Sequence, residues 1–156
     1  MDDERWVAFV RGAHRPGTLT ALAAVFSTRG VNFESLATAE VDGTTGLIVV
    51  TFRSTARRQQ ELARAVERLT PVHSVLVRRT ADLGVRAAGV MHLPRGVTFR
   101  PPAQAAVAWS GVSEAGEPVL VEGPLVDVEL VVAAAREAGA VVSGIVIQPP
   151  PAPDGR

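Results

Sequence analysis

The stretch from His14 to Leu36 constrains the fold more than any other part of the chain, because it carries the signals of a strand end, a turn, a helix and a second strand in succession. Pro16 has a fixed φ and no N–H, so it suits a turn or the first position of a helix. Gly17 lets the backbone approach a neighbour or a ligand closely. The N–H groups that follow have no partner within a helix, so this helix start favours a carboxylate or another anion.

The far end of this stretch carries Asn32, the only asparagine in the chain. Gly30 has the position of a helix C-cap, and Asn32 follows it at the start of a predicted strand. All 16 basic residues are arginine and tyrosine is missing, a pattern typical of a GC-rich coding bias under which asparagine is also scarce. We therefore interpret Asn32 as present for its amide. The alternative is a local Asx-type bond to its own backbone.

Apolar periodicity and turn signals predict a βαββαβ order in the first half of the chain. The predicted strands are 5–11, 31–41, 46–53 and 72–79, and the predicted helices are 18–28 and 56–69. Asp42-Gly43 indicates a hairpin turn between the second and third strands, and Ser54 or Thr55 caps the second helix. Two right-handed crossovers then interleave into a four-stranded antiparallel sheet with both helices on one face, which is the ferredoxin-like α+β arrangement.

The second half predicts a smaller α+β unit, a ββ hairpin followed by a βαβ unit. Its expected elements are strands at 87–93 and 105–110 around a loop at 94–102, a strand at 118–122, a helix beginning at Gly123-Pro124 and a closing strand at 141–148. The expected domains are 1–79, a linker at 80–86, a second small domain or degenerate half at 87–148, and a Pro-rich disordered or extended tail at 149–156.

The composition narrows the possible functions. The net charge is zero, which offers no general attraction to nucleic acid or to an anionic membrane. There is no cysteine, and His14, His73 and His92 lack metal-ligand spacing, so we expect no metal and no cofactor. The acidic N-terminus lacks the apolar core of a signal peptide, and no apolar run is long enough to span a bilayer. A cytoplasmic protein is the expectation.

Residues 5–79 resemble an ACT domain, the small-molecule-sensing module of amino-acid metabolism. The resemblance rests on Pro-Gly-Thr-Leu at 16–19, Val-Phe-Ser-Thr-Arg-Gly at 25–30 and Val-Asn-Phe-Glu-Ser-Leu at 31–36. Within the family the chain is most similar to the N-terminal domain of the acetolactate (acetohydroxyacid) synthase regulatory subunit. The second half matches no family, and it is shorter than the usual C-terminal domain of that subunit.

The resemblance implies a site for an amino acid or a related carboxylate at the interface of a dimer. One subunit contributes the loop after the first strand, and the other contributes the strand that follows the first helix. The implied ligand-binding residues are His14, Arg15, Pro16, Gly17, Thr18, Leu19, Asn32 and Phe33. Regulatory subunits usually carry an asparagine where this chain has His14, so valine is not assumed to be the ligand.

Two functions follow. The first is a homodimeric regulatory or sensor protein that binds an amino acid and modulates a biosynthetic enzyme, such as an acetolactate synthase-like partner. The alternative is a small enzyme on the same scaffold, acting on a carboxylate-bearing or apolar metabolite with His92 or His14 as acid/base. The lack of a recognisable nucleophile, metal set or cofactor motif favours binding over catalysis.

Three other features have simpler interpretations. The arginines of the second predicted helix are interspersed with glutamates and indicate a solvated face. Glu34 and Glu40 share one strand face, where polarity at a sheet edge is commoner than a catalytic pair. Gly123-Pro124 could hold an anion at a helix start, although a plain turn is the commoner use of such a pair.

Overall fold

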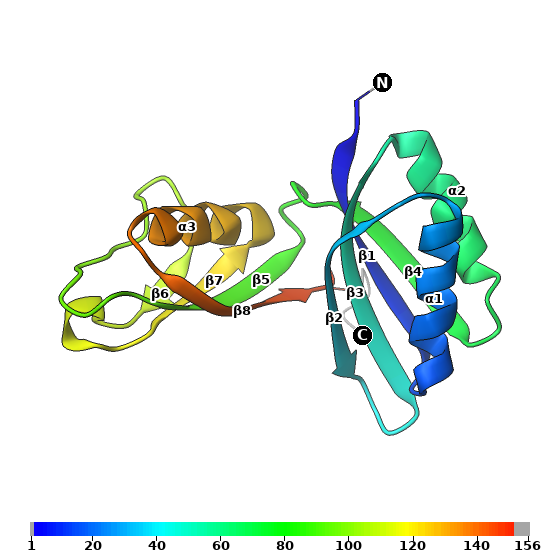
Figure 1. The fold of residues 1–156 in the computed structure, drawn as a ribbon, viewed down its shortest axis with the longest axis horizontal. Helices are drawn as coiled ribbons and strands as arrows, with labels where there is room; N and C mark the ends of the chain where they lie inside the picture. Colours follow the sequence, from blue (N-terminus) through cyan, green and yellow to red (C-terminus); the bar gives the residue numbers. More distant parts are fainter. Residues whose placement is uncertain (1, 152–156) are drawn as a thin grey trace. The chain divides into compact units, whose positions relative to one another are not determined.

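The computed structural model describes residues 2–151, and the chain divides after Thr80 into two compact units. Each unit contains one four-stranded antiparallel sheet (Figure 1). Residues 149–151, at the start of the predicted Pro-rich tail, form no helix or strand. The rest of that tail lies outside the described residues.

The first unit has the predicted βαββαβ order. Its elements are β1 (Glu4–Ala13), α1 (Pro16–Thr28), β2 (Phe33–Glu40), β3 (Thr45–Ser54), α2 (Ala56–Glu67) and β4 (Val72–Arg79). The strand order in the sheet is β2-β3-β1-β4, and α1 and α2 lie together on one face (Figure 1). The ferredoxin-like α+β fold predicted for this half is therefore confirmed.

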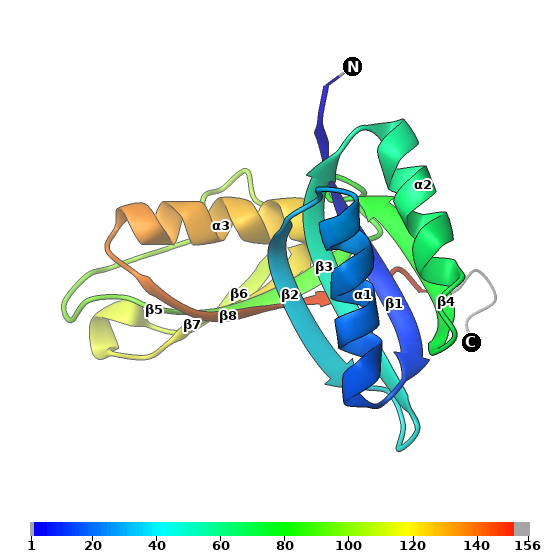
Figure 2. The ribbon, with the colours of Figure 1, turned by 45° about the vertical axis from the view of Figure 1, so that its right-hand side comes forward.

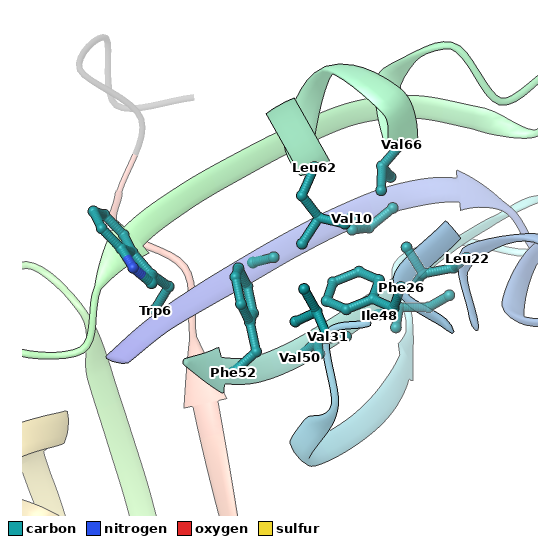
Figure 3. Close-up of a cluster of buried hydrophobic side chains, with 11 residues drawn as sticks. Trp6, Val10, Leu22, Phe26, Val31, Ile48, Val50, Phe52, Leu62 and Val66 are labelled. Carbon is teal, nitrogen blue, oxygen red and sulfur yellow. The ribbon is translucent and has the colours of Figure 1, made fainter. Parts of the chain in front are cut away.

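The core of this unit lies between the sheet and its two helices (Figure 3). The inward side chains of the central strand β1 meet Leu22 and Phe26 of α1 and Leu62 and Val66 of α2. These four helix side chains are each at most 2% exposed. The ring of Phe26 makes edge-to-face contact with that of Phe52, with centroids 5.3 Å apart. Fully burying a side chain of this kind stabilises the fold by about 1.5–3 kcal/mol, so these contacts hold α1 and α2 on the sheet.

Local signals place the ends of the elements. Thr55 caps α2, because its side-chain oxygen accepts a hydrogen bond from the backbone N–H of Arg58 at 3.2 Å. The Asp42 carboxylate accepts the backbone N–H groups of Thr44 and Thr45, each at 2.8 Å, and so closes the turn between β2 and β3. Helix α1 begins at Pro16, two residues before the predicted start, because proline is well suited to the first helical turn.

The second unit contains β5 (Arg86–His92), β6 (Ala108–Ser110), a short 3₁₀ helix (Ser113–Ala115), β7 (Val119–Pro124), α3 (Leu125–Glu137) and β8 (Val141–Gln148). The strand order is β6-β7-β5-β8. In order of appearance along the chain, this arrangement matches that of the first sheet. Residues 93–107 stand where the first unit has its first helix, and α3 covers one face of the sheet (Figure 2).

Two details of this unit differ from the sequence-based prediction. β5 and β6 do not form the expected hairpin, because β7 lies between them and pairs with both. Pro124 precedes the first residue of α3 and does not occupy its first turn. A Cβ atom on Gly123 would lie 2.8 Å from the carbonyl oxygen of Ala106, so the glycine permits close backbone packing, in line with the plain-turn interpretation.

Candidate functional site

A pocket of about 310 Å³ opens in the first unit where β1 leads into α1. Three segments form it: the β1–α1 turn with the first turn of α1, the end of β2, and the start of β3. Its lining residues are Gly12, Ala13, His14, Arg15, Pro16, Thr18, Leu19, Thr38, Ala39, Gly46, Leu47 and Ile48. The pocket therefore combines a helix N-terminus with mostly apolar walls.

Backbone hydrogen bonds hold the turn at the mouth of this pocket. The N–H of Ala13 donates to the carbonyl of Pro71 at 2.8 Å, and the N–H of His14 donates to the carbonyl of Thr44 at 2.9 Å. The buried hydroxyl of Thr18 donates to the carbonyl of Ala13 at 2.7 Å. The first two bonds tie the turn to the residue before β4 and to the β2–β3 hairpin, and the third ties the start of α1 to the turn, so the helix start is held in a defined position.

The backbone N–H groups at the start of α1 differ in whether they already have a hydrogen-bond acceptor. The N–H of Thr18 donates to the carbonyl of Arg15 at 3.2 Å, so this group is already partnered. Gly17 lies in the first turn, where N–H groups have no acceptor within the helix, and a Cβ built on it would meet no atom within 4 Å. The start of α1 has no acidic side chain in its first turn. The helix dipole there favours an anion.

The structure brings together most, but not all, of the predicted site residues. His14, Arg15, Pro16, Thr18 and Leu19 line the pocket, and Gly17 lies in the same turn. The other two predicted residues, Asn32 and Phe33, follow the C-terminal end of α1 and do not line the pocket.

Asn32 is exposed and Phe33 is half-buried against the core, with its ring 4.6 Å from that of Phe26. They follow the last turn of α1, a helix about 20 Å long, so they lie far from the pocket of their own chain. Only a second chain could bring Asn32 to the pocket of the first, which is the arrangement that the ACT resemblance implies.

Sequence reasoning missed the pocket wall formed by β2 and β3. Antiparallel pairing sets Gly12 opposite Gly46 and Arg11 opposite Leu47, which brings the start of β3 beside the β1–α1 turn. A Cβ atom on Gly46 would lie 3.1 Å from Nδ1 of His14, so this glycine leaves room for the imidazole. The Asp42-Gly43 turn signal, combined with the predicted strand order, could have located this wall.

The other candidate sites are occupied or dispersed. Glu34 forms ion pairs with Nε of Arg5 at 3.1 Å and with Nε of Arg53 at 2.9 Å, as expected for a polar side chain at the edge of a sheet. Across residues 2–151, no three histidine, aspartate or glutamate side chains gather as metal ligands.

No helix of residues 2–151 is both long enough and apolar enough to cross a membrane.

Comparisons with known proteins find a matching family model and similar solved structures. A family model of the AHAS (acetohydroxyacid synthase) small subunit-like ACT domain matches residues 10–75. The acetolactate synthase small subunit from Thermotoga maritima is similar with a TM-score of 0.63 at 15% identity, over 93% of this chain and 96% of that chain. The ligand-free regulatory subunit of aspartate kinase from Thermus thermophilus gives a TM-score of 0.51 at 14% identity, over 86% and 93%.

A comparison with curated proteins gave no match. At such low identities the two solved structures show the fold, while the family model also covers the β1–α1 turn and the start of β2. Residues 10–75 form an ACT domain that resembles the ACT domain of the acetohydroxyacid synthase small subunit.

Proposed function

We propose that this chain is a regulatory protein that binds an amino acid, or a related small carboxylate, in the pocket at the start of α1. The observation that carries the proposal is the pocket itself, because an anion-favouring helix start and an apolar wall meet in one hollow of about 310 Å³. That volume lies at the lower end of the range for small-molecule sites. An amino acid needs this combination, since it carries a carboxylate at one end and a side chain at the other.

Each part of the pocket has a role in this proposal. The carboxylate lies at the first turn of α1 and accepts a hydrogen bond from the N–H of Gly17, a charge-assisted bond worth roughly 1.5–3 kcal/mol. The apolar side chain of the ligand packs against Leu19 and Leu47. His14 also lines the pocket and supplies a ring nitrogen for the ammonium or another polar group of the ligand.

We further propose that the site is completed in a homodimer. β2 is an edge strand whose residues after Phe33 are all exposed, so its backbone groups are available for pairing with a second chain. In such a dimer Asn32 of one chain reaches the pocket of the other, and its amide bonds the ligand carboxylate or ammonium. The ligand then binds to the dimer in preference to the monomer.

A biosynthetic enzyme, such as an acetolactate synthase-like partner, is the proposed target of this regulation. The support is the match of residues 10–75 to the ACT domain of a synthase small subunit. Co-purification of the two proteins, with activity measured with and without the ligand, tests this part separately from ligand binding.

A thermal-shift screen of the twenty amino acids tests the binding proposal directly. A ligand present at about 100 times its dissociation constant stabilises the folded state by about 2.7 kcal/mol. For a protein of this size that is a rise in melting temperature of roughly 5–10 °C. No shift with any amino acid, at concentrations up to several millimolar, would contradict the proposed ligand class.

The assembly is tested by sedimentation of the full chain across concentrations. We expect a dimer at tens of micromolar, roughly the range in which weak dimers begin to dissociate. A monomer under those conditions would remove the interfacial site, even if a ligand still bound.

A further inference from the structure

Glu40, the last residue of β2, lies on the same face of the first sheet as α1. Antiparallel pairing sets Thr38 opposite Ile48 and Glu40 opposite Gly46. Ile48 belongs to the core beneath the helices, and the side chains of directly opposite residues lie on one face. Glu40 is two residues after Thr38, so its side chain also points to the helix side, where the pocket at the start of α1 lies.

The other glutamate of β2, Glu34, lies on the opposite face. The six-residue spacing predicts a shared face, but the register of β2 against β3 shifts immediately after Phe33, beside Glu34. The ion-pair partners of Glu34 are Arg5 and Arg53, which alternate with the core-facing residues of β1 and β3. The shared face expected from the sequence is therefore wrong, and Glu40 alone of the two lies beside the pocket.

The missing side chain of Gly46 leaves a space bordered by hydrogen-bond acceptors. A Cβ atom on Gly46 would lie 3.1 Å from Nδ1 of His14 and 3.7 Å from the carbonyl oxygen of Ala39. The Cβ atoms of directly opposite residues are about 4.5–5.5 Å apart, so the side chain of Glu40 begins roughly that far from the same point. A neutral imidazole nitrogen, a carbonyl oxygen and a carboxylate thus surround the space above Gly46, and all three accept hydrogen bonds.

The charges around the pocket leave one role unfilled. The two ionisable side chains that line it, His14 and Arg15, are both basic, so they suit the carboxylate of a ligand and not its ammonium group. The Asp42 carboxylate in the nearby hairpin is already bonded to three donors of its own turn. The side chain of Glu40 is exposed and has no hydrogen-bond or ion-pair partner among residues 2–151. Glu40 is therefore the negative group available to an ammonium.

We propose that Glu40 holds the ammonium group of an α-amino acid above Gly46, while the carboxylate of the ligand lies at the start of α1. Nδ1 of His14 and the carbonyl oxygen of Ala39 complete this seat as uncharged acceptors. The pocket then selects an α-amino acid over the 2-oxo acid with the same side chain, which carries the carboxylate without the positive charge. This inference rests on the proposed function and narrows its ligand class from small carboxylates to zwitterionic amino acids.

Three matched ligand pairs test the selection by calorimetric titration of the full chain. The pairs are L-alanine with pyruvate, L-valine with 3-methyl-2-oxobutanoate, and L-leucine with 4-methyl-2-oxopentanoate. In at least one pair we expect the amino acid to bind at least about tenfold more tightly, which is the worth of one charge-assisted hydrogen bond. Equal binding within every pair, or a preference for the oxo acids, would overturn the inference and leave a carboxylate site in place. Binding of none of the six would also overturn it, and the screen of all twenty amino acids decides the proposed function separately.

Two variants assign the selection to Glu40. Glu40→Gln removes the charge at nearly constant size, and we expect it to weaken binding of the preferred amino acid by about tenfold or more. Its affinity for the matching oxo acid should not fall, so the preference is lost. Glu34→Gln makes the same change on the other face of β2 and should keep the preference. If Glu40→Gln also keeps it, or loses affinity for both ligands equally, Glu40 does not hold the ammonium and the inference is wrong.

Discussion

The two units share a strand order but differ in what precedes their second strand. In the first unit β1 turns sharply into α1, and the pocket lies at that turn. In the second unit β5 leads into residues 93–107, which contain no helix, so this sheet lacks a helix start at the equivalent place. Both units have the sheet, but the strand-to-helix turn belongs to the first. The candidate ligand site therefore depends on that turn and not on the sheet.

The two units also differ in what faces their sheets. In the first sheet two helices, α1 and α2, cover one face, and the side chains of Trp6, Ala8 and Val10 beneath them are at most 5% exposed. In the second sheet one face carries Leu120 and Val146 at about half exposure.

The largest expected effects come from substitutions that destabilise the core of one unit at a time. Leu22→Ala in the first unit and Met91→Ala in the second each remove a fully buried side chain, at a cost of about 2–5 kcal/mol. We expect both to lower the melting temperature of the unit that carries them. Only Leu22→Ala should also abolish the thermal shift by the amino acid identified in the screen. Loss of that shift in Met91→Ala would place the ligand in the second unit.

Gly17→Val is the next largest test, because it should abolish the ligand-induced shift of about 2.7 kcal/mol. The branched side chain would occupy the approach to the helix start. It should leave the fold intact, since a Cβ there meets nothing within 4 Å and the φ of Gly17 is not positive. Gly43→Val, at the tip of the β2–β3 hairpin with equally open space, is the matched control and should keep the full response.

Asn32→Ala should weaken ligand binding by about one to two orders of magnitude, which is the cost of an unmade buried hydrogen bond. The free chain should keep its stability, because Asn32 is exposed in it. Calorimetric titration of the two proteins measures the ratio of dissociation constants. An unchanged affinity would show that the site is complete within one chain, contrary to the dimer proposal.

The smallest predicted effect concerns the hairpin that supports the pocket wall. The backbone N–H of Thr44, its hydroxyl and the N–H of Thr45 all donate to the Asp42 carboxylate, and these bonds lower the pKa of Asp42 below its ordinary value of 3.8. A lowered pKa in the folded state means that the ionised form stabilises the turn above pH 3.8. That stabilisation is lost as the pH falls through the lowered pKa.

Asp42→Ala should therefore melt below the natural protein at pH 7, with a gap that narrows below about pH 3.8. Asp42→Asn retains a side-chain acceptor without the titrating charge and serves as the control. Melting temperatures measured between pH 2.5 and pH 7, roughly spanning the titration of an aspartate, check both expectations. A gap that is independent of pH would contradict the assigned role of the carboxylate.

Much of the first unit is determined by local sequence. Pro16, Gly30, the Asp42-Gly43 turn and the Thr55 cap mark the ends of its elements through backbone geometry and short-range hydrogen bonds, which act whatever the rest of the chain does. The apolar spacing of Leu22 and Phe26 likewise fixes which face of α1 is buried. These signals were sufficient for the strand order, because right-handed crossovers leave few alternatives.

Tertiary structure alone decided the rest. The register of β1 against β3 sets Gly12 opposite Gly46, and it therefore determines which residues of β2 and β3 line the pocket. Register is a property of two paired strands and not of one strand alone. β7 lies between β5 and β6, where sequence order predicted a hairpin, because pairing partners are chosen by burial across the whole sheet. Ala88, Ala108 and Gly144 likewise line one hollow only because β5, β6, β7 and β8 bring them together from distant positions in the sequence.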